Sequence, residues 1–155
     1  MVNIGNKEAT TRSARAEATV HVGEKICRLL KASQSAGGSS PHSSKGDVFS
    51  VARLAGIMGA KQTSSLIPLC HPVELAHVGV ELWLESGRNE VRVEATATTT
   101  PARTGVEMEA LTAASVAALT VYDMCKAGGK GITIRNVQLI EKTGGRSGVW
   151  RREES

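Results

Sequence analysis

The sequence predicts an α+β domain with the ferredoxin-like order β-α-α-β-β-α-β. Segments in which apolar and polar residues alternate predict strands, and segments with apolar residues three and four positions apart predict helices. They follow one another as a strand, two helices, a hairpin, a long helix and a final strand, which is a split βαβ unit with an extra helix. We therefore expect one antiparallel sheet with helices on one face, built as a single domain over residues 1–155.

The first third of the chain predicts a strand and two helices. Residues 12–22 alternate as in a half-buried strand, and residues 23–32 have the spacing of a short amphipathic helix. Residues 33–44 are rich in Ser and Gly and predict a mobile loop. Asp47 is a suitable N-cap for the next helix, which we expect to end near Thr63.

The middle of the chain predicts a hairpin. Pro68 and Pro72 forbid a continuing helix and place His71 on a stiff turn. Residues 75–85 and 90–99 then alternate on either side of a short polar turn, as expected for two antiparallel strands.

The last predicted strand covers residues 131–142. Its alternation slips near Asn136, so we expect a β-bulge there. Residues 149–155 are expected to form a tail. The sheet face opposite the helices would carry Trp83 and would be available for contact with another subunit.

A long helix over residues 104–127 organises the rest of the chain. Thr104 and Glu107 have the spacing of a capping box, and two glycines after the helix predict its end through a left-handed turn. Apolar residues fall all round this helix, so we expect it to be covered on two sides. Asp123 and Lys126 lie one turn apart near its end, either as a surface ion pair or as a catalytic pair.

Composition restricts the function. The net charge is +4 and the pI is about 9.2, which favours an anionic partner such as a polynucleotide, a nucleotide or a phosphate metabolite. The odd number of widely spaced cysteines indicates reduced thiols. No apolar run of transmembrane length and no signal pattern occur, so we expect a cytoplasmic protein with no membrane partner.

Several kinds of site can be weighed from the residues. Cys70, His71 and His77 are too few for a closed metal site, and the loop around Lys130 lacks the phosphate-loop pattern. Only Trp83 among the scarce aromatic residues lies on a predicted strand, so base stacking with a nucleic acid is not expected. The cations at element ends together suit a small polyanion such as a triphosphate. They are Arg12, Arg15, Lys45, Lys126 and Lys142. A non-catalytic RNA- or nucleotide-binding module is the main alternative to an enzyme.

Several strings in the chain resemble the MoaC family, the cyclic pyranopterin monophosphate synthases of molybdenum cofactor biosynthesis. They are Lys45-Gly46-Asp47-Val48, Leu66-Ile67-Pro68-Leu69-Cys70-His71-Pro72, the run from Thr104 to Lys126, and residues 141–148. The resemblance extends over nearly the whole chain. It implies a ferredoxin-like homohexamer, a trimer of dimers, with the active site at a subunit interface.

The resemblance also implies a lyase activity. The substrate would be a GTP-derived cyclised nucleotide, (8S)-3′,8-cyclo-7,8-dihydroguanosine 5′-triphosphate, converted to cyclic pyranopterin monophosphate and pyrophosphate. Carried over by motif, the catalytic residues are Asp123, Lys126 and Lys45. The substrate-binding residues are Cys70, His71, Glu107, Met108, Lys142 and Arg12. No cofactor is expected, and whether Mg²⁺ accompanies the triphosphate is left open.

Two further expectations depend on this resemblance. Lys126 would act as an acid once desolvation and neighbouring cations lower its pKa towards neutrality. The family usually has Asp where this chain has Asn3, so a relative that binds substrate without turning it over is a second alternative.

Overall fold

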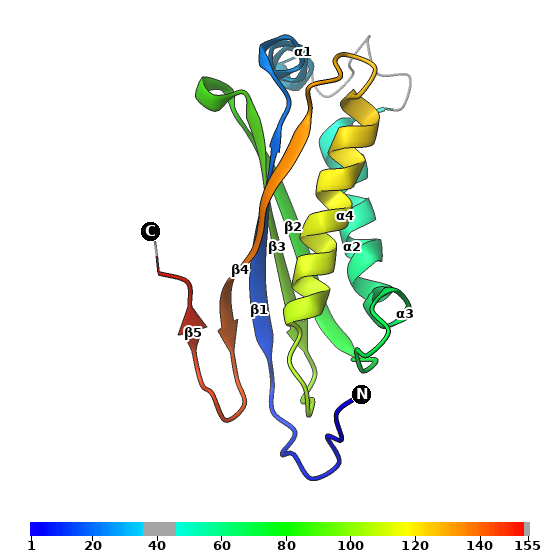
Figure 1. Cartoon of the computed structure of the whole chain (residues 1–155), viewed down its shortest axis with the longest axis vertical. Helices are drawn as coiled ribbons and strands as arrows, with labels where there is room; N and C mark the ends of the chain where they lie inside the picture. The colour runs from blue at the N-terminus through cyan, green and yellow to red at the C-terminus, as the bar shows by residue number, and fades with distance from the viewer. Residues whose placement is uncertain (36–45, 154–155) are drawn as a thin grey trace.

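An antiparallel sheet with helices on one face forms the framework of the protein (Figure 1). The computed structural model describes residues 1–35 and 46–153. The strand order is β2-β3-β1-β4-β5, and every neighbouring pair is antiparallel. The strands are β1 Ser13–His21, β2 Leu75–Glu85, β3 Glu90–Thr99, β4 Thr133–Thr143 and β5 Trp150–Arg151. The predicted ferredoxin-like α+β class is therefore confirmed.

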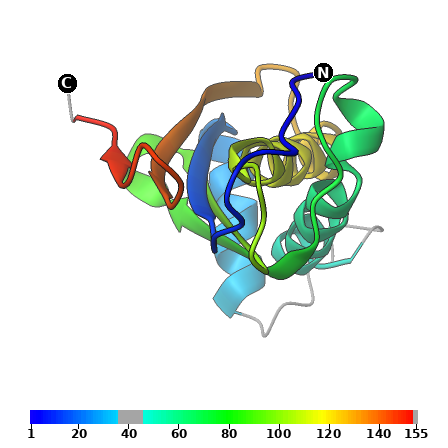
Figure 2. The ribbon, with the colours of Figure 1, turned by 90° about the horizontal axis from the view of Figure 1, so that it is seen from below.

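Two long helices lie side by side on one face of the sheet, while a third lies at the end of the sheet where β1 finishes (Figures 1 and 2). The helices are α1 Glu24–Ser35, α2 Val48–Lys61, α3 Thr63–Leu66 and α4 Glu107–Cys125, with a single 3-10 turn η1 at Ser86–Arg88. Asp47 caps α2 as predicted, because its carboxylate accepts hydrogen bonds from the amides of Phe49 and Ser50 at 3.2 Å. The predicted Ser/Gly loop lies outside the described residues from residue 36 onward.

The core is built from small side chains. Ala16 and Ala18 on β1 and Ala113, Ala114 and Ala117 on α4 are fully buried. The largest fully buried side chains in the described residues are valines and threonines. Because these side chains are short, α4 lies close to the sheet on one side and to α2 on the other. The expected cover on both sides of α4 is thus supplied in part by α2 of the same chain.

Glycines on α2 make the approach to α4 possible. A Cβ on Gly56 would lie 2.9 Å from the carbonyl oxygen of Ala113, and a Cβ on Gly59 would lie 2.8 Å from a Val116 methyl. A glycine inside a helix is destabilising by about 0.5–1 kcal/mol relative to alanine. The close contact between the two helices offsets that cost, so these two positions are fixed by packing.

The ends of α4 differ from the prediction. The helix begins at Glu107 with Val106 at its N-cap, and no side chain caps it, so the predicted Thr104 capping box is wrong. The physical reason is that the helix begins three residues later, at Glu107, and the carboxylate of Glu107 pairs with Lys142. The predicted left-handed glycine turn is also wrong, because Gly128 is not among the described glycines with positive φ. Its missing side chain instead leaves room for Ile26 of α1, which a Cβ would approach to 3.0 Å.

Two features of the sheet concern its register and its edge. Asn136 adopts φ 52° and the β1–β4 register shifts beside it, which confirms the predicted bulge. The predicted tail contains β5, which pairs with the end of β4, so that part of the prediction is wrong.

No helix in residues 1–35 and 46–153 packs on the opposite face of the sheet. Trp83 is exposed there, as predicted. Ion pairs cross the strands on this face, with 2.9 Å between Arg15 and Glu94 and 2.9 Å between Arg92 and Glu17. None of the helices in residues 1–35 and 46–153 has the length and hydropathy needed to cross a lipid bilayer.

Candidate active site

A cationic cleft of about 840 Å³ lies beside the N-terminal end of α4. Arg12 enters it from the segment before β1, Lys142 from the end of β4, and Arg103 from the loop before α4. Lys7 and Arg146 also line it. Arg12 and Lys142 were predicted, whereas the other three were missed. They lie outside helices and strands, where no periodicity marks a residue as part of a site.

A second hollow of about 280 Å³ adjoins the cleft. Cys70 and His71 reach it from the loop after α3, and Met108 and Glu109 reach it from the first turn of α4. The N-terminal segment 1–7 passes the start of α4 and forms another wall (Figure 2). The two hollows are adjacent, because they share lining residues. The shared residues are Lys7, Thr104, Gly105 and Glu107.

An ion pair connects α4 to β4 inside the cleft. The Lys142 ammonium lies 2.7 Å from a Glu107 carboxylate oxygen, and both side chains are about two-thirds buried. Burial alone would raise the pKa of Glu107, but the hydrogen bond from Lys142 and the positive charges of Lys142 and Arg12 lower it below its usual value. Glu107 therefore stays ionised and holds Lys142 in place.

A second carboxyl group lies two residues further along α4. Glu109 is 4% exposed, and burial raises its pKa above the ordinary glutamate value, with a smaller contribution from the charge of Glu107. Burial and the charge of Glu109 also raise the pKa of the Cys70 thiol. Glu109 was not predicted as a site residue, although the Glu-Met-Glu string in the resemblance contains it. The pair of carboxyl groups has opposite pKa shifts, which is a common feature of acid–base sites.

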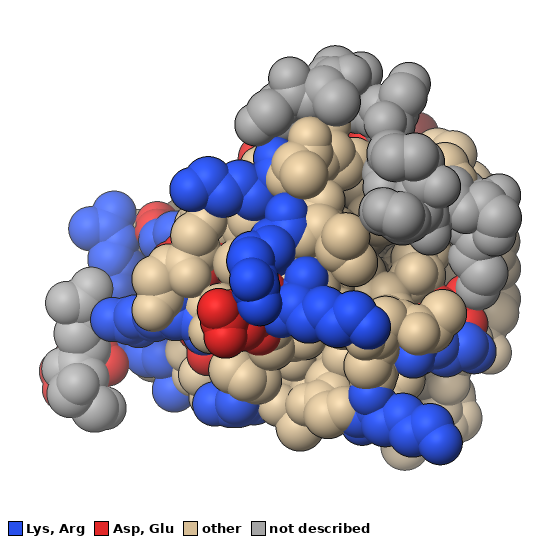
Figure 3. Space-filling view, turned by 90° about the horizontal axis from the view of Figure 1, so that it is seen from above, with Lys and Arg blue, Asp and Glu red and all other residues tan. Residues whose placement is uncertain are grey.

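The predicted catalytic pair lies at the other end of α4. The Lys126 ammonium is 2.6 Å from an Asp123 carboxylate oxygen, and the two side chains are 57% and 50% exposed. The hydrogen bond and the charge of Asp123 raise the pKa of Lys126. The expected lowering by desolvation is therefore not found in the single chain, because the amine is exposed. Lysine and arginine side chains also gather over this end of the molecule (Figure 3).

The two groups of predicted residues are far apart. Asp123 follows Glu107 by sixteen positions on the helix, so the distance along α4 is about 24 Å at a rise of about 1.5 Å per residue. The structure thus brings together all the predicted substrate-binding residues and leaves Asp123 and Lys126 at the opposite end. Lys45 lies outside the described residues.

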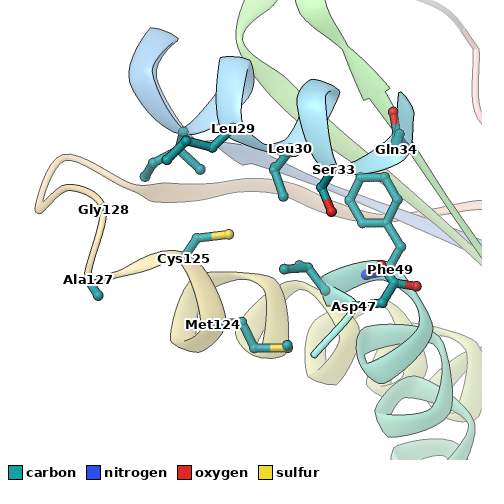
Figure 4. Close-up of a pocket in the computed structure, with 12 residues that line it drawn as sticks. Leu29, Leu30, Ser33, Gln34, Asp47, Phe49, Met124, Cys125, Ala127 and Gly128 are labelled. Atoms are coloured by element: carbon teal, nitrogen blue, oxygen red, sulfur yellow. Dashed lines mark hydrogen bonds between the residues drawn. The ribbon is translucent and has the colours of Figure 1, made fainter. Parts of the chain in front are cut away.

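An apolar pocket of about 90 Å³ lies between α1, the start of α2 and the end of α4 (Figure 4). Leu30, Phe49, Met124 and Cys125 line it, and burial raises the pKa of the Cys125 thiol to about 11. The charged residue at its rim, Asp47, is already engaged in capping α2. Among the residues that the structure describes, the lining of this pocket offers no cation to a polyanion.

Cysteine and metal chemistry can be checked directly. Cys27, Cys70 and Cys125 are free thiols, as predicted. Within the part of the chain that the structure describes, no three His, Cys, Asp or Glu side chains are grouped so that they could hold a metal ion.

Comparison with known proteins identifies close relatives. The model of the MoaC family matches residues 1–145. The chain is 50% identical over 155 residues to the cyclic pyranopterin monophosphate synthase of Chloroflexus aggregans, covering the whole of this chain and 88% of that protein. It is 54% identical over 153 residues to the molybdenum cofactor biosynthesis protein 1 of Drosophila melanogaster, covering 99% of this chain but only 26% of the fly protein.

Proposed function

The chain belongs to the MoaC family, and from this membership we infer that it is a cyclic pyranopterin monophosphate synthase. In the proposed reaction, (8S)-3′,8-cyclo-7,8-dihydroguanosine 5′-triphosphate is rearranged to cyclic pyranopterin monophosphate and pyrophosphate leaves. The observation that carries this proposal is the 50% identity, over the whole chain, to a protein of that name. The cationic cleft supports it, because charge-assisted contacts from Arg and Lys are the strong class of bond to phosphate.

The cleft suggests roles for the residues at the start of α4. Arg12 and Lys142 would bind the triphosphate, and Glu107 would hold Lys142 until the phosphate arrives. His71 and Glu109 line the adjoining hollow, where the purine-derived ring would lie. Because burial favours the protonated form of Glu109, its carboxyl group is suited to donate a proton.

Asp123 and Lys126 would supply acid–base chemistry only if a second copy of the chain completes the site. A catalytic group must come within hydrogen-bond reach of the proton that it moves, and about 24 Å of helix separates this pair from the cleft of its own chain. We therefore propose a composite site, with the start of α4 from one copy and the end of α4 from another. Covering by that second copy would desolvate Lys126 and lower its pKa.

A homohexamer, a trimer of dimers, would provide such interfaces. Apolar side chains are exposed on the outer side of the helical layer, as expected for surfaces that are covered in an oligomer. On α2 they are Val51, Leu54 and Met58, and on α4 there is Leu119. No cofactor is included in the proposal, and a chelator titration would test whether Mg²⁺ accompanies the triphosphate.

Complementation between two inactive variants tests the proposal. Lys126→Ala damages one half of the composite site and Lys142→Ala damages the other, so each variant alone should release almost no pyrophosphate from the cyclised substrate. Co-expressed together, they should recover activity, because random pairing gives about a quarter of the sites two intact halves. Recovery is not expected for Lys126→Ala co-expressed with Asp123→Asn, which damages the same half and is the matched control.

Two outcomes would contradict the proposal. Turnover by the Lys126→Ala variant, expressed without a second variant, would show that Lys126 is not needed for catalysis. Failure of the two different half-site variants to complement each other, in an assembly of normal size, would exclude the composite site. Binding of RNA that grows with length and weakens with salt, without turnover of the nucleotide, would favour a nucleic-acid-binding module.

A further inference from the structure

Arg12 is held firmly at its backbone and closely packed at its side chain. Its amide donates to the Thr99 hydroxyl at 3.0 Å, and its carbonyl accepts from the Thr99 amide at 2.9 Å. The guanidinium lies against the turn formed by Gly144 and Gly145. A Cβ on Gly145 would overlap with the Arg12 Nη1 atom and would lie 2.8 Å from Cζ. A Cβ on Gly144 would lie 2.9 Å from Cδ.

The two glycines also need their special backbone. Gly144 has φ 90° and Gly145 has φ 73°, a region that residues with a side chain rarely adopt. The turn therefore combines two properties that only glycine supplies: it bends through left-handed backbone, and it offers a bare surface on which the guanidinium lies. This contact fixes the direction of the Arg12 side chain.

One donor of Arg12 is left without a partner. Its Nε atom is buried and has no hydrogen-bond partner within the described residues. A buried N–H group without a partner is costly. The Arg12 side chain lines the cleft together with Lys142 and Arg103. Arginine presents its N–H groups as a rigid fork that matches phosphate oxygens. A polyphosphate bound in the cleft is the ligand that this fork suits.

We propose that Gly144 and Gly145 form a cradle that positions the Arg12 guanidinium for a polyphosphate anion. They are positioning residues, since they act through Arg12 and need not touch the ligand. The inference rests on the proposed function, because it takes the triphosphate of the substrate as the ligand of Arg12. Beyond that function, it assigns to Gly144 and Gly145 the role of setting the direction of the Arg12 side chain.

The chain contains a matched control for this cradle. Gly148 has φ 61°, so an alanine there suffers the same kind of backbone strain, but a Cβ on Gly148 meets no atom within 4 Å. Gly145→Ala should displace Arg12, because the guanidinium is the movable end of a flexible side chain. Gly148→Ala should leave Arg12 in place.

Calorimetric binding of inorganic tripolyphosphate to the intact protein is the measurement. Gly145→Ala and Arg12→Ala should each weaken binding by about ten- to a hundredfold, the range for losing a hydrogen bond to a charged group. Gly148→Ala should stay within about twofold of the unchanged protein. The double variant Gly145→Ala with Arg12→Ala should bind no more weakly than Arg12→Ala alone, because the glycine acts only through the arginine.

Several results would overturn the cradle. These are equal weakening by Gly145→Ala and Gly148→Ala, additive losses in the double variant, or no tripolyphosphate binding by the unchanged protein. Failure of the proposed function looks different: the cradle variants would behave as expected towards tripolyphosphate, while the unchanged protein would not release pyrophosphate from the cyclised nucleotide. Conversely, full turnover with an unaltered KM in Gly145→Ala would refute the cradle and leave the proposed function intact.

Discussion

Two glutamates in the first turn of α4 should respond to the same substitution in opposite directions. At pH 7, Glu107→Gln removes a charge that Lys142 binds at 2.7 Å, so it should destabilise the protein. Glu109→Gln removes a carboxyl group whose ionised form burial disfavours, so it should stabilise the protein. The two positions lie in one helical turn and the chemical change is identical, which removes helix propensity as an explanation.

The magnitude for Glu107 follows from its burial. Exposed ion pairs contribute about 0.2–1 kcal/mol and hydrogen bonds to charged groups about 1.5–3 kcal/mol. Because both partners are about two-thirds buried, an intermediate loss of about 1–1.5 kcal/mol is expected. For a chain of this size that corresponds to a melting temperature lower by roughly 2–6 °C. Glu24→Gln is the control, because its ion pair with Arg28 is fully at the surface.

The pH dependence of stability provides a second test of the opposite effects expected for the two substitutions. The pKa of folded Glu107 is lowered, so its contribution to stability is present above the unfolded pKa of about 4.5 and is lost as the pH falls through the folded value. The pKa of folded Glu109 is raised, so its penalty appears as the pH rises above about 4.5. Urea unfolding at pH 7 and in acid, at one protein concentration, measures both. A loss in Glu107→Gln no larger than in Glu24→Gln, or a destabilised Glu109→Gln at pH 7, would refute this reasoning.

Three further predictions follow from other parts of the molecule. Asp123→Asn or Lys126→Ala should abolish pyrophosphate release while changing the melting temperature little, since the pair is exposed in the single chain and supports no part of its core; a large drop in melting temperature would show a structural role instead. Gly59→Ala should destabilise the protein by about 1–2 kcal/mol, because overpacking against α4 outweighs the gain in helix propensity; calorimetric melting checks this, and a rise in melting temperature would contradict it. The Cys125 thiol should resist iodoacetamide at pH 8, where a pKa of about 11 leaves about one thiol in a thousand ionised; rapid labelling seen by mass spectrometry would contradict that.

The sheet and the long helices were predictable because the spacing of apolar residues along the sequence matches the periods of strands and helices. The alternation of β2 and β3 gave their bounds, since one side of each strand is buried and the other is not. The start of α4 was mispredicted because local spacing favoured a Thr104 cap, whereas the distant Lys142 binds Glu107. Pairing between residues that are distant in sequence is invisible to a local pattern.

The candidate site was predictable only in part, for a related reason. The motif resemblance identified residues such as Arg12, whose neighbours in space come from another part of the chain. It did not reveal that α4 separates Asp123 from the cleft, because a linear motif contains no distance. The burial of Glu109 could not be predicted from the sequence either. The side of α4 that carries it is buried near Glu109 and exposed near Asp123.

The small side chains of the core should make this protein more tolerant of truncated side chains than of enlarged ones. In a leucine-rich interior, truncating a side chain leaves a large cavity; here the fully buried positions are Ala, Val and Thr, so truncation removes little volume. Substitution of a buried residue by a larger one is expected to be more damaging, because α2, α4 and the sheet are already in close contact. A complete mutational scan should therefore find that positions such as Ala113 and Ala117 accept glycine or serine more readily than leucine or phenylalanine.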